Sequence, residues 1–463
     1  MSHPDCGSPT RADPRELTSD SGERVAYPGP DALLHSQALV EPELSSEPRL
    51  LARFAKAISE CGLVGESALA QLVYLVITSR LLDKPVSLGV KGLSSSGKSF
   101  VVETTLGFFP PRAVLAMTAM SQKALIYTKE DLRHRTLVLY EVEALREGND
   151  EDQTAYFVRS LLSEGRIDYY VAVRSPEKGE GFVTRKVTKE GPTGLIFTTT
   201  KAQIHRDNET RVISATSDDS TEQTARILVS MAAGNSESVD LTAWLQLQEW
   251  LECAERRVVI PYAVTLAKLV QPTAVRLRRD FKAVLGLIQA HAILHQRTRE
   301  RDAEGRIVAT WEDYEQVRRL VAPLISEGVR MAVSLATRET VDAIIELAPT
   351  NPDGVMGTVL AAKLKLDPSA ARRRLEVAER GGWVVNQEDR SRRPGRWAVG
   401  EPLPTREQIL PPAERVHAAA KASAFKEASD PISIDPSEGT KALGSDRRSD
   451  SASSVSVLDE VVV

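Results

Sequence analysis

The sequence predicts an α/β fold built on a covered parallel sheet, followed by a helical region and a small third unit. A glycine-rich loop at 92–99 lies between an apolar run at 86–90 and a helical pattern at 100–109. Two further apolar runs, at 137–140 and 195–200, end in polar residues and are separated by segments with helical spacing. Short, continuously apolar runs that alternate with helices are typical of the buried strands of a parallel sheet.

The glycine-rich loop reads Gly-Leu-Ser-Ser-Ser-Gly-Lys-Ser and fits the phosphate-binding P-loop pattern. Its backbone N–H groups can surround phosphates at the start of the next helix, and its two glycines permit the tight turn. The alternative is a flexible Gly/Ser loop, and the strand before and the helix after argue against it. The pattern predicts ATP and Mg²⁺ as cofactors, with Lys98 on the outer phosphates and Ser99 on the metal. The residues that it assigns to the nucleotide are Gly92, Ser94, Ser95, Ser96, Gly97, Lys98 and Ser99.

The composition limits the other classes of function. The 463 residues carry a net charge of −5, so a DNA-binding surface must be a local basic patch. The three cysteines, Cys6, Cys61 and Cys253, are too far apart to predict a zinc site or a disulfide framework, and we expect a cytoplasmic protein. No apolar run reaches the roughly eighteen residues of a membrane span, so no membrane segment is expected.

Changes in composition predict five parts of the chain. Residues 1–48 are rich in Pro, Ser, Gly and acids, and we expect them to be disordered. The nucleotide-binding core covers 49–235, a helical region 236–335 and the third unit 336–402. The tail, 403–463, is polar and is also expected to be disordered.

A basic β-hairpin is expected between the second and third apolar runs. Its arms are 167–173 and 182–187, and the turn-rich segment 176–181 joins them. A solvated basic loop is the alternative. Its basic residues are Lys178, Arg185, Lys186 and Lys189, and the family resemblance described below implies that they contact DNA phosphates.

The third unit predicts a winged helix. Three helices with Ser369 capping the third, then two strands around a basic loop at 390–393, follow each other in the order of that fold. Residues 353–400 hold ten Lys/Arg and six Asp/Glu, a net charge of +4. A winged helix that contacts only proteins is the alternative to DNA binding. The expected DNA contacts are Arg372, Arg373, Arg374, Arg392 and Arg393.

The segment Leu139–Leu145 is similar to the Walker B segment of the AAA+ class, and within that class of the minichromosome-maintenance helicases. The resemblance places Glu141 on the catalytic glutamate that polarises water. Tyr140 falls where the family has its magnesium aspartate, which is a departure from the pattern. Glu141 and Glu143 therefore both stay open as metal ligands.

Three more segments continue this resemblance. Thr200, after the third apolar run, matches the sensor 1 position, which orients the attacking water. The segment 208–212 looks like the one that carries the arginine finger, which implies that Arg211 completes the site of a neighbouring subunit. The segment 274–281, running on to His291, is similar to the sensor 2 helix and favours Arg279 over its two neighbouring arginines.

A closer resemblance is to the ATPase module of bacterial and phage-type primase–helicases, carried by 94–99, 160–166 and 206–211 and covering about 60–400. It implies an AAA+ P-loop ATPase core with a parallel sheet, a helical lid and a C-terminal winged helix. It further implies a ring-shaped homo-oligomer that acts on DNA as a helicase or translocase in a mobile-element or replication-like system, with a primase or another replication protein as partner. Neither a zinc-finger cysteine pattern nor a primase region precedes the ATPase, so priming is not implied.

Two other classes stay open. An ATP-dependent transcription regulator would also use a winged helix, but the Gly-Ala-Phe-Thr-Gly-Ala loop of the sigma-dependent type does not occur between Pro111 and Tyr140. A defence or signalling NTPase would use ATP as a switch. Such proteins usually end in long repeats, and this sequence shows no internal repeat. Tyr140 at the metal position is the feature that favours this last class.

Overall fold

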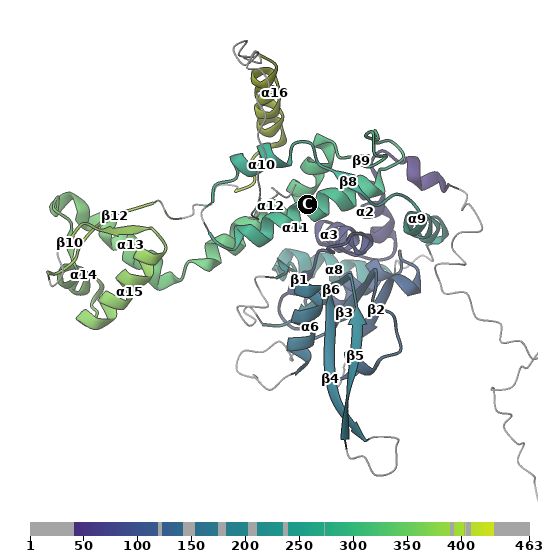
Figure 1. Cartoon of the computed structure of the whole chain (residues 1–463), viewed down its shortest axis with the longest axis horizontal. Helices are drawn as coiled ribbons and strands as arrows, with labels where there is room; N and C mark the ends of the chain where they lie inside the picture. Colours follow the sequence, from purple (N-terminus) through teal and green to yellow (C-terminus); the bar gives the residue numbers. More distant parts are fainter. Residues whose placement is uncertain are drawn as a thin grey trace, which may run out of the picture. The chain divides into compact units, whose positions relative to one another are not determined.

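The computed structural model describes residues 41–118, 123–141, 153–174, 182–201, 211–234, 239–272, 274–388, 393–401, 403 and 409–429 (Figure 1). The chain divides into two compact units, Met1–His417 and Ala418–Val463. Helix α16 (Ala413–Ser429) crosses this boundary, and its residues from 418 onward are the described part of the second unit.

The first unit is built on a five-stranded sheet in the order β2-β3-β6-β1-β7, with every neighbouring pair parallel. This confirms the predicted α/β fold with a parallel sheet. The three predicted apolar runs are β1, β3 and β6, whereas β2 and β7 were not predicted. The strands are β1 (Leu88–Lys91), β2 (Val114–Met117), β3 (Arg135–Leu139), β6 (Thr193–Thr199) and β7 (Ile213–Thr216).

Helices cover both faces of this sheet, so its central strands are apolar on both sides. Val138 and Ile196 belong to the larger core, whereas Leu137 and Leu195 belong to a second cluster with Val158 on the other face. This alternation follows the two-residue period of a strand. The connecting helices are α4 (Lys98–Leu106), α5 (Ala124–Tyr127) and α6 (Gln153–Glu164).

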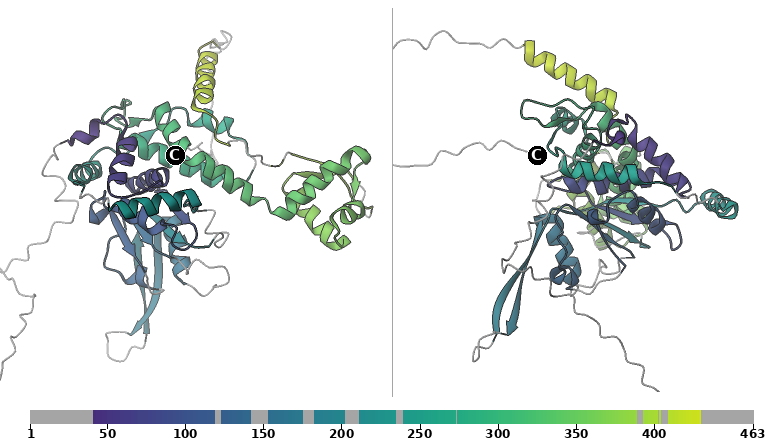
Figure 2. Two further views of the ribbon diagram at one scale, coloured as in Figure 1. Left: turned by 180° about the vertical axis from the view of Figure 1, so that it is seen from behind. Right: turned by 90° about the vertical axis from the view of Figure 1, so that its right-hand side faces the viewer.

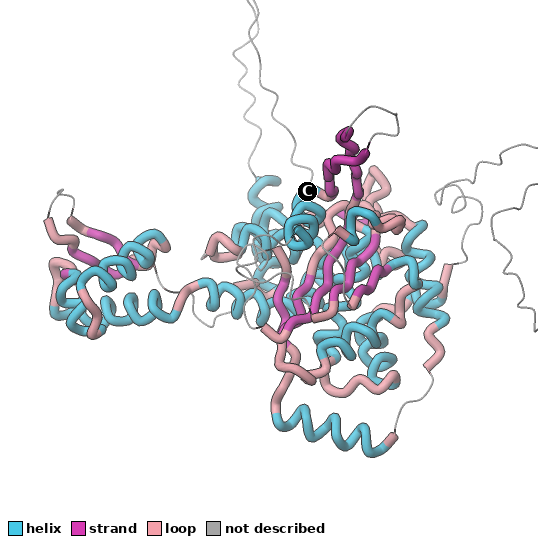
Figure 3. Tube along the Cα trace, turned by 90° about the horizontal axis from the view of Figure 1, so that it is seen from below, coloured by secondary structure: helices cyan, strands magenta, loops and turns pink. Residues whose placement is uncertain are grey.

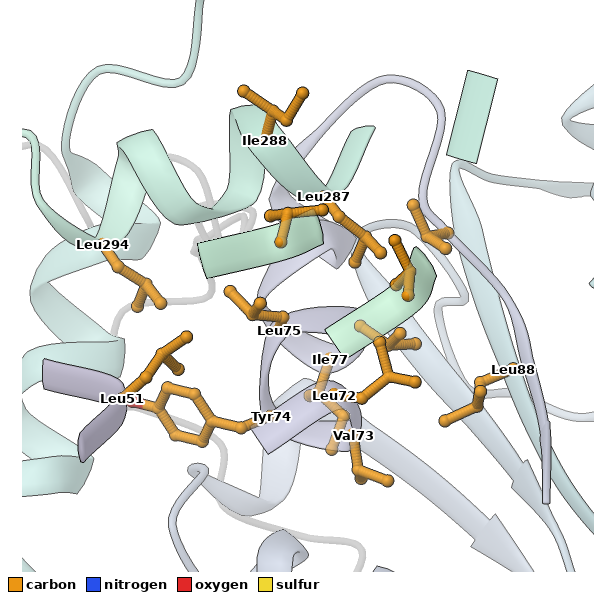
Figure 4. Close-up of a cluster of buried hydrophobic side chains, with 14 of the residues drawn as sticks. Leu51, Leu72, Val73, Tyr74, Leu75, Ile77, Leu88, Leu287, Ile288 and Leu294 are labelled. Carbon is orange, nitrogen blue, oxygen red and sulfur yellow. The ribbon is translucent and has the colours of Figure 1, made fainter. Parts of the chain in front are cut away.

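Helix α3 (Ser67–Thr78) lies at the centre of the larger core. Its residues are apolar on all sides and nearly all buried, as expected of a helix with neighbours all round. It packs against α2 (Leu50–Glu60), α11 (Leu277–Leu294) and α12 (Trp311–Ala332). Figure 4 shows Leu72, Leu75 and Ile77 of α3 close to Leu287 of α11.

The predicted hairpin is present. Strands β4 (Arg166–Arg174) and β5 (Phe182–Glu190) pair antiparallel over nine residues each. They are inserted between α6 and β6, and Figures 1 and 2 show the hairpin extending beyond the parallel sheet. The turn that joins the two strands lies outside the described residues.

The region 236–335 is mainly helical, but it is not all helical as the sequence suggests. It contains α9 (Thr242–Cys253), α10 (Ala263–Leu269), α11 and α12, together with a parallel pair of two-residue strands, β8 (Val258–Val259) and β9 (Ile307–Val308). Among the described helices, no single one is long and apolar enough to cross a bilayer. One bent pair, Trp311–Arg330 with Leu335–Thr350, passes by length and composition alone.

The third unit contains three helices and a three-stranded antiparallel sheet around a core of its own. The helices are α13 (Leu335–Leu347), α14 (Gly357–Leu364) and α15 (Pro368–Arg380), and the sheet has the order β10 (Val355–Met356), β12 (Arg396–Val399), β11 (Val384–Asn386). The predicted cap was wrong. Asp367, not Ser369, caps α15, because its carboxylate accepts the N–H groups of Ser369 (2.8 Å) and Ala370 (3.0 Å).

Both predicted disordered ends contain packed residues. Leu44, in the short 3-10 helix Glu43–Ser46, is buried, and so are Leu410 and Val416 at the other end. The tyrosine hydroxyl of Tyr314 also donates to the Pro411 carbonyl (2.6 Å). The prediction was therefore wrong for 41–48 and for 409–429, and the rest of both segments, apart from residue 403, lies outside the described residues.

Candidate nucleotide-binding site

Four chain segments meet at one edge of the parallel sheet. The P-loop follows β1, Glu141 follows β3, Thr200 follows β6 and Ser217 follows β7. The parallel register pairs Lys91, the last residue of β1, with Thr199 on one side and Thr216 on the other. Because the carboxyl ends of parallel strands share an edge, all four segments lie together there, as is usual for ligand sites in such sheets.

The conformation of the P-loop requires its glycines. Gly97 has φ +83° and immediately precedes α4, and Gly92 has φ +154°. A Cβ added to Gly92 would lie 2.3 Å from Ser217 Oγ and 2.8 Å from Ser96 Oγ. A side chain at this position is therefore disfavoured both by the backbone conformation and by Ser217, the residue that follows β7.

Lys98 is the first residue of α4 and is 5% exposed. Its ammonium donates to the backbone carbonyls of Gly92 (3.0 Å) and Leu93 and lies 3.4 Å from Ser96 Oγ. Burial lowers the pKa of Lys98, and the nearby Glu141 acts in the opposite direction. The lysine is thus held over the loop with the charge of Glu141 close by.

Ser217, which was not predicted, fixes the loop to the edge strand. Its hydroxyl lies 2.7 Å from Ser96 Oγ, and its N–H donates to the Lys91 carbonyl (2.9 Å). Ser96 is half-buried, whereas Ser94 and Ser95 are exposed. Ser94 and Ser95 are therefore the serines that present the open side of the loop.

Glu141 is held in an uncommon backbone conformation, with φ +50°. Its N–H donates to the hydroxyl of Thr198, a buried residue of β6 (3.0 Å). A positive φ at a non-glycine residue is sparsely populated and often marks a functional position. This bond ties the end of β3 to the end of β6, and the charge of Glu141 acts on Lys98 of the loop.

Tyr140 carries no negative charge that could replace that of an aspartate. Burial raises the pKa of Tyr140 to about 12, and Glu103 on α4 acts in the same direction. The phenol therefore stays neutral at physiological pH and cannot serve as an anionic ligand. Glu103 is exposed and lies one helical turn after Ser99, so the two side chains share a face of α4. It is a further acid of the site that the sequence did not indicate.

The oxygen donors at this edge fit Mg²⁺. That ion is usually held by one or two carboxylates together with nucleotide phosphates and water, rather than by a cage of protein ligands. The hydroxyl of Ser99, next to Lys98 in the chain, and the carboxylate of Glu141, whose charge acts on Lys98, are the oxygen donors that could take this role. The described residues contain no group of three or more His, Cys, Asp or Glu side chains that could hold a metal. Glu143 lies outside the described residues.

The other predicted catalytic residues take different places. Thr200 is exposed at the same edge as the P-loop. Arg211 is half-buried and precedes β7, so it lies toward the opposite, amino edge of the sheet. Arg279 is exposed on the first turn of α11, whereas its neighbour Arg276 pairs with the buried Asp280 (2.8 Å).

The predicted contacts on the hairpin are not equivalent. Arg185 is exposed, and Lys186 is exposed beside Asp168 (3.2 Å) and over the ring of Tyr170. Lys189 lies at the base, where its ammonium donates to the carbonyls of Thr128 and Glu130 (3.4 Å). Lys189 therefore fastens the hairpin to the core. Lys178 lies outside the described residues.

In the third unit, Arg372 and Arg373 are exposed on α15, although Arg372 also meets Glu376. Arg374 is turned toward Glu339 of α13 (3.0 Å) and is partly covered. Arg393 is exposed just before β12, and Arg392 lies outside the described residues.

The comparisons with known proteins agree with the site. A family model described as the MTBMA_p00010 P-loop domain matches residues 52–161, which include β1, the P-loop, α4 and Glu141. Motif, sheet and match together define this part of the chain as a P-loop nucleotide-binding domain. No curated protein matches the chain.

Solved structures also resemble the chain. One is the full-length MCM homolog from Methanopyrus kandleri, with a TM-score of 0.41 and 12% identity. The match covers 64% of this chain and 61% of that one. This likeness is too distant to carry an argument about function.

Proposed function

We propose that the protein is a Mg²⁺-dependent ATPase that works as an oligomeric motor on DNA. One observation carries the proposal: in chain order the β4–β5 hairpin lies between β3, which Glu141 follows, and β6, which Thr200 follows. A long basic hairpin thereby leads directly into β6, a strand whose carboxyl end lies at the proposed nucleotide site.

The hairpin has the side chains that a nucleic-acid surface needs. Phe182 is 78% exposed on β5, the strand that carries Arg185 and Lys186, and Tyr170 is 62% exposed on β4, where it pairs with Lys186. Exposed aromatic rings that stack on bases, together with cations that follow phosphates, are the usual means of binding single strands. Nine residues per strand, at about 3.4 Å each, give a hairpin of about 30 Å.

The chemistry follows from the residues at the sheet edge. Lys98 and the loop N–H groups bind the phosphates, and Glu141 accepts a proton from the attacking water while Thr200 orients it. Bound Mg²⁺, next to Ser99 and Glu141, would neutralise charge on the outer phosphates. Arg279 adds positive charge at this site, and Arg211 does so for a neighbouring copy.

Movement would reach the hairpin through the bond between Glu141 and Thr198. This bond joins the end of β3 to β6, and β6 follows β5 directly in the chain. A shift of Glu141 on hydrolysis would therefore displace β6, the strand that directly follows the hairpin. Lys189 fixes the base of the hairpin, so the displacement is passed to its exposed part.

The third unit has the order of elements of a winged helix, and we assign it a DNA-docking role. The exposed guanidinium groups of Arg372 and Arg373 on α15 carry this part of the proposal. Changing both to Ala should weaken DNA binding and reduce its salt dependence, while ATP hydrolysis without DNA stays intact. Unchanged DNA affinity would point instead to a unit that contacts proteins.

The hairpin provides the main test. In the variant Arg185→Ala/Lys186→Ala, ATP hydrolysis without DNA should match the wild type, while stimulation by single-stranded DNA should fall. The slope of log affinity against log salt should decrease by about 0.7 for each lost phosphate contact. The matched control is Arg53→Ala/Lys56→Ala, which removes two exposed cations from α2. If DNA does not change the rate of ATP hydrolysis by the wild type, the proposed motor function is wrong.

A switch NTPase is the second candidate, and Tyr140 favours it. A neutral phenol at the metal position supplies no anionic ligand and favours slow turnover. The switch would be supported if single-turnover ATP hydrolysis were far slower than the release and rebinding of DNA, and if a partner bound only in one nucleotide state. Fast turnover under DNA stimulation would support the motor.

A further inference from the structure

Helix α8 (Thr221–Ala233) follows β7 and lies at the surface of the first unit. Figures 2 and 3 show the helix beside the body of the first unit, without a helix packed on its outer side. Its first turn is fastened, because Gln223 donates to the Val64 carbonyl (2.6 Å) and Ser220 caps the helix. Gln223 is the buried residue of the helix, and the turns after it carry no comparable attachment.

The apolar side of α8 faces outward. Ala225, Leu228, Val229 and Ala232 follow the i, i+3, i+4, i+7 spacing that forms one stripe on a helix. All four are exposed, with Leu228 at 61% and Val229 at 70%, and the adjoining Met231 is at 74%. The opposite side, with Gln223, is the one that meets the body. A helix of this pattern normally buries its apolar stripe, so α8 has the amphipathicity of a helix whose partner is another molecule.

The same chain carries an apolar groove elsewhere. The groove lies between α10 and the start of α11, has a volume of about 280 Å³ and is lined by Ala267, Val270, Pro272, Val275 and Phe281 among others. Val275 is 75% exposed at its rim, and Arg278 lines it as well. Such a groove accepts the apolar stripe of a helix, as in other helix-in-groove complexes.

We propose that the apolar stripe of α8 docks into the α10–α11 groove of a second copy of this chain. The two surfaces are different parts of one molecule, so the contact is head-to-tail, and repetition closes a ring or extends a filament. Glu222, exposed on the first turn of α8, can meet Arg278 at the groove of the next copy. The occupant is a second copy because one chain carries both matching surfaces.

The position of α8 supports this occupant. The helix begins four residues after Ser217, whose hydroxyl lies against the P-loop, so a copy seated on α8 lies beside the nucleotide. The proposed ATPase site needs an arginine from another copy at this place. The role that we assign to this contact therefore rests on the proposed function, but the contact itself can be tested without measuring ATP hydrolysis.

Self-association of the full-length chain is the first measurement. Leu228→Ser/Val229→Ser and Val275→Asp should each weaken assembly in sedimentation experiments at least tenfold, because each removes an apolar side chain from the contact. The matched control Leu335→Ser changes a residue that is 73% exposed on α13 and should leave assembly unchanged. Labelled-ATP binding should stay unchanged in all three, which shows that the core is folded. Assembly unaffected by both docking variants would overturn the proposal.

Cross-linking tests the pairing itself. In a background with Cys6, Cys61 and Cys253 changed to Ser, chains with Leu228→Cys are mixed with chains with Val275→Cys. A short thiol cross-linker should join the two kinds of chain and should not join either kind to itself. Joining of Leu228→Cys chains to one another would show a symmetric α8 pair and refute the groove. If the two kinds of chain are cross-linked but the protein does not hydrolyse ATP, the docking contact is supported and the proposed motor function is refuted.

Discussion

Replacing Arg211 tests whether the nucleotide site is shared between two copies. Arg211 precedes β7, and the P-loop edge begins at Ser217, after that strand. The four residues of β7, at about 3.3 Å each, separate the two ends of the strand by about 13 Å. This exceeds the length of an arginine side chain. We therefore expect that Arg211 does not reach the phosphates bound by its own subunit.

The variant Arg211→Ala should bind labelled ATP with unchanged affinity but hydrolyse it far more slowly. An arginine finger contributes about 10³–10⁵ to turnover, which corresponds to about 4–7 kcal/mol of activation free energy. Steady-state ATP hydrolysis per subunit, measured over a range of protein concentrations, gives the rate. The control Arg257→Ala removes an exposed arginine that donates to Glu255, two residues away, and to the Glu304 carbonyl, and this variant should hydrolyse ATP normally.

Mixing provides the sharper result. Lys98→Ala chains lack a phosphate-binding lysine but keep Arg211, so they should partly restore hydrolysis when mixed with Arg211→Ala chains, although neither is active alone. Full activity in Arg211→Ala would refute the shared site. Loss of ATP binding in that variant would show that Arg211 supports the fold of the core instead.

Three further results are expected. Glu141→Gln should keep ATP bound and reduce hydrolysis by about 10²–10⁴, as measured by single-turnover assays; an unaffected rate would transfer the role of base to another acid. Gly92→Ala should reduce ATP affinity in titrations, because its Cβ would lie 2.3 Å from Ser217 Oγ, whereas Ser217→Ala alone should bind nearly normally. Burial lowers the pKa of His295 to about 3, so between pH 6 and 4 the unfolded chain binds a proton that the folded chain does not. As the pH is lowered through this range, the unfolding free energy of the wild type should therefore decrease. This decrease should be about 1.4 kcal/mol per pH unit larger than in His295→Leu, as measured by denaturant titration.

The features predictable from the sequence are those coded by neighbouring residues. The P-loop, the strand before Glu141 and the hairpin each depend on a continuous pattern of spacing or turn residues. Strands β2 and β7 have four residues each, and β2 is not fully buried, so neither gives an apolar run that differs from a helix or a loop. These two short edge strands were therefore not predicted from the sequence pattern.

The missed residues depend on contacts between distant parts of the chain. Ser217 meets Ser96 across 121 positions, and Thr198 meets the N–H of Glu141 across 57. Neither serine nor threonine carries a local signal that separates it from an ordinary surface residue. Leu410 and Val416 were missed for a similar reason, because single apolar residues in a polar segment reveal nothing about the core that buries them.

The carboxyl and amino edges of the parallel sheet carry different groups of functional candidates. Its carboxyl edge carries Lys98, Glu141 and Ser217, and α8 leaves from this same edge. Arg211 lies toward the other edge, so in the proposed function the Arg211 that completes the site comes from another copy. The proposed docking contact would seat this copy against α8, beside the nucleotide. Assembly and hydrolysis should consequently weaken together when the stripe at Leu228 and Val229 is made polar, even though neither residue touches the nucleotide.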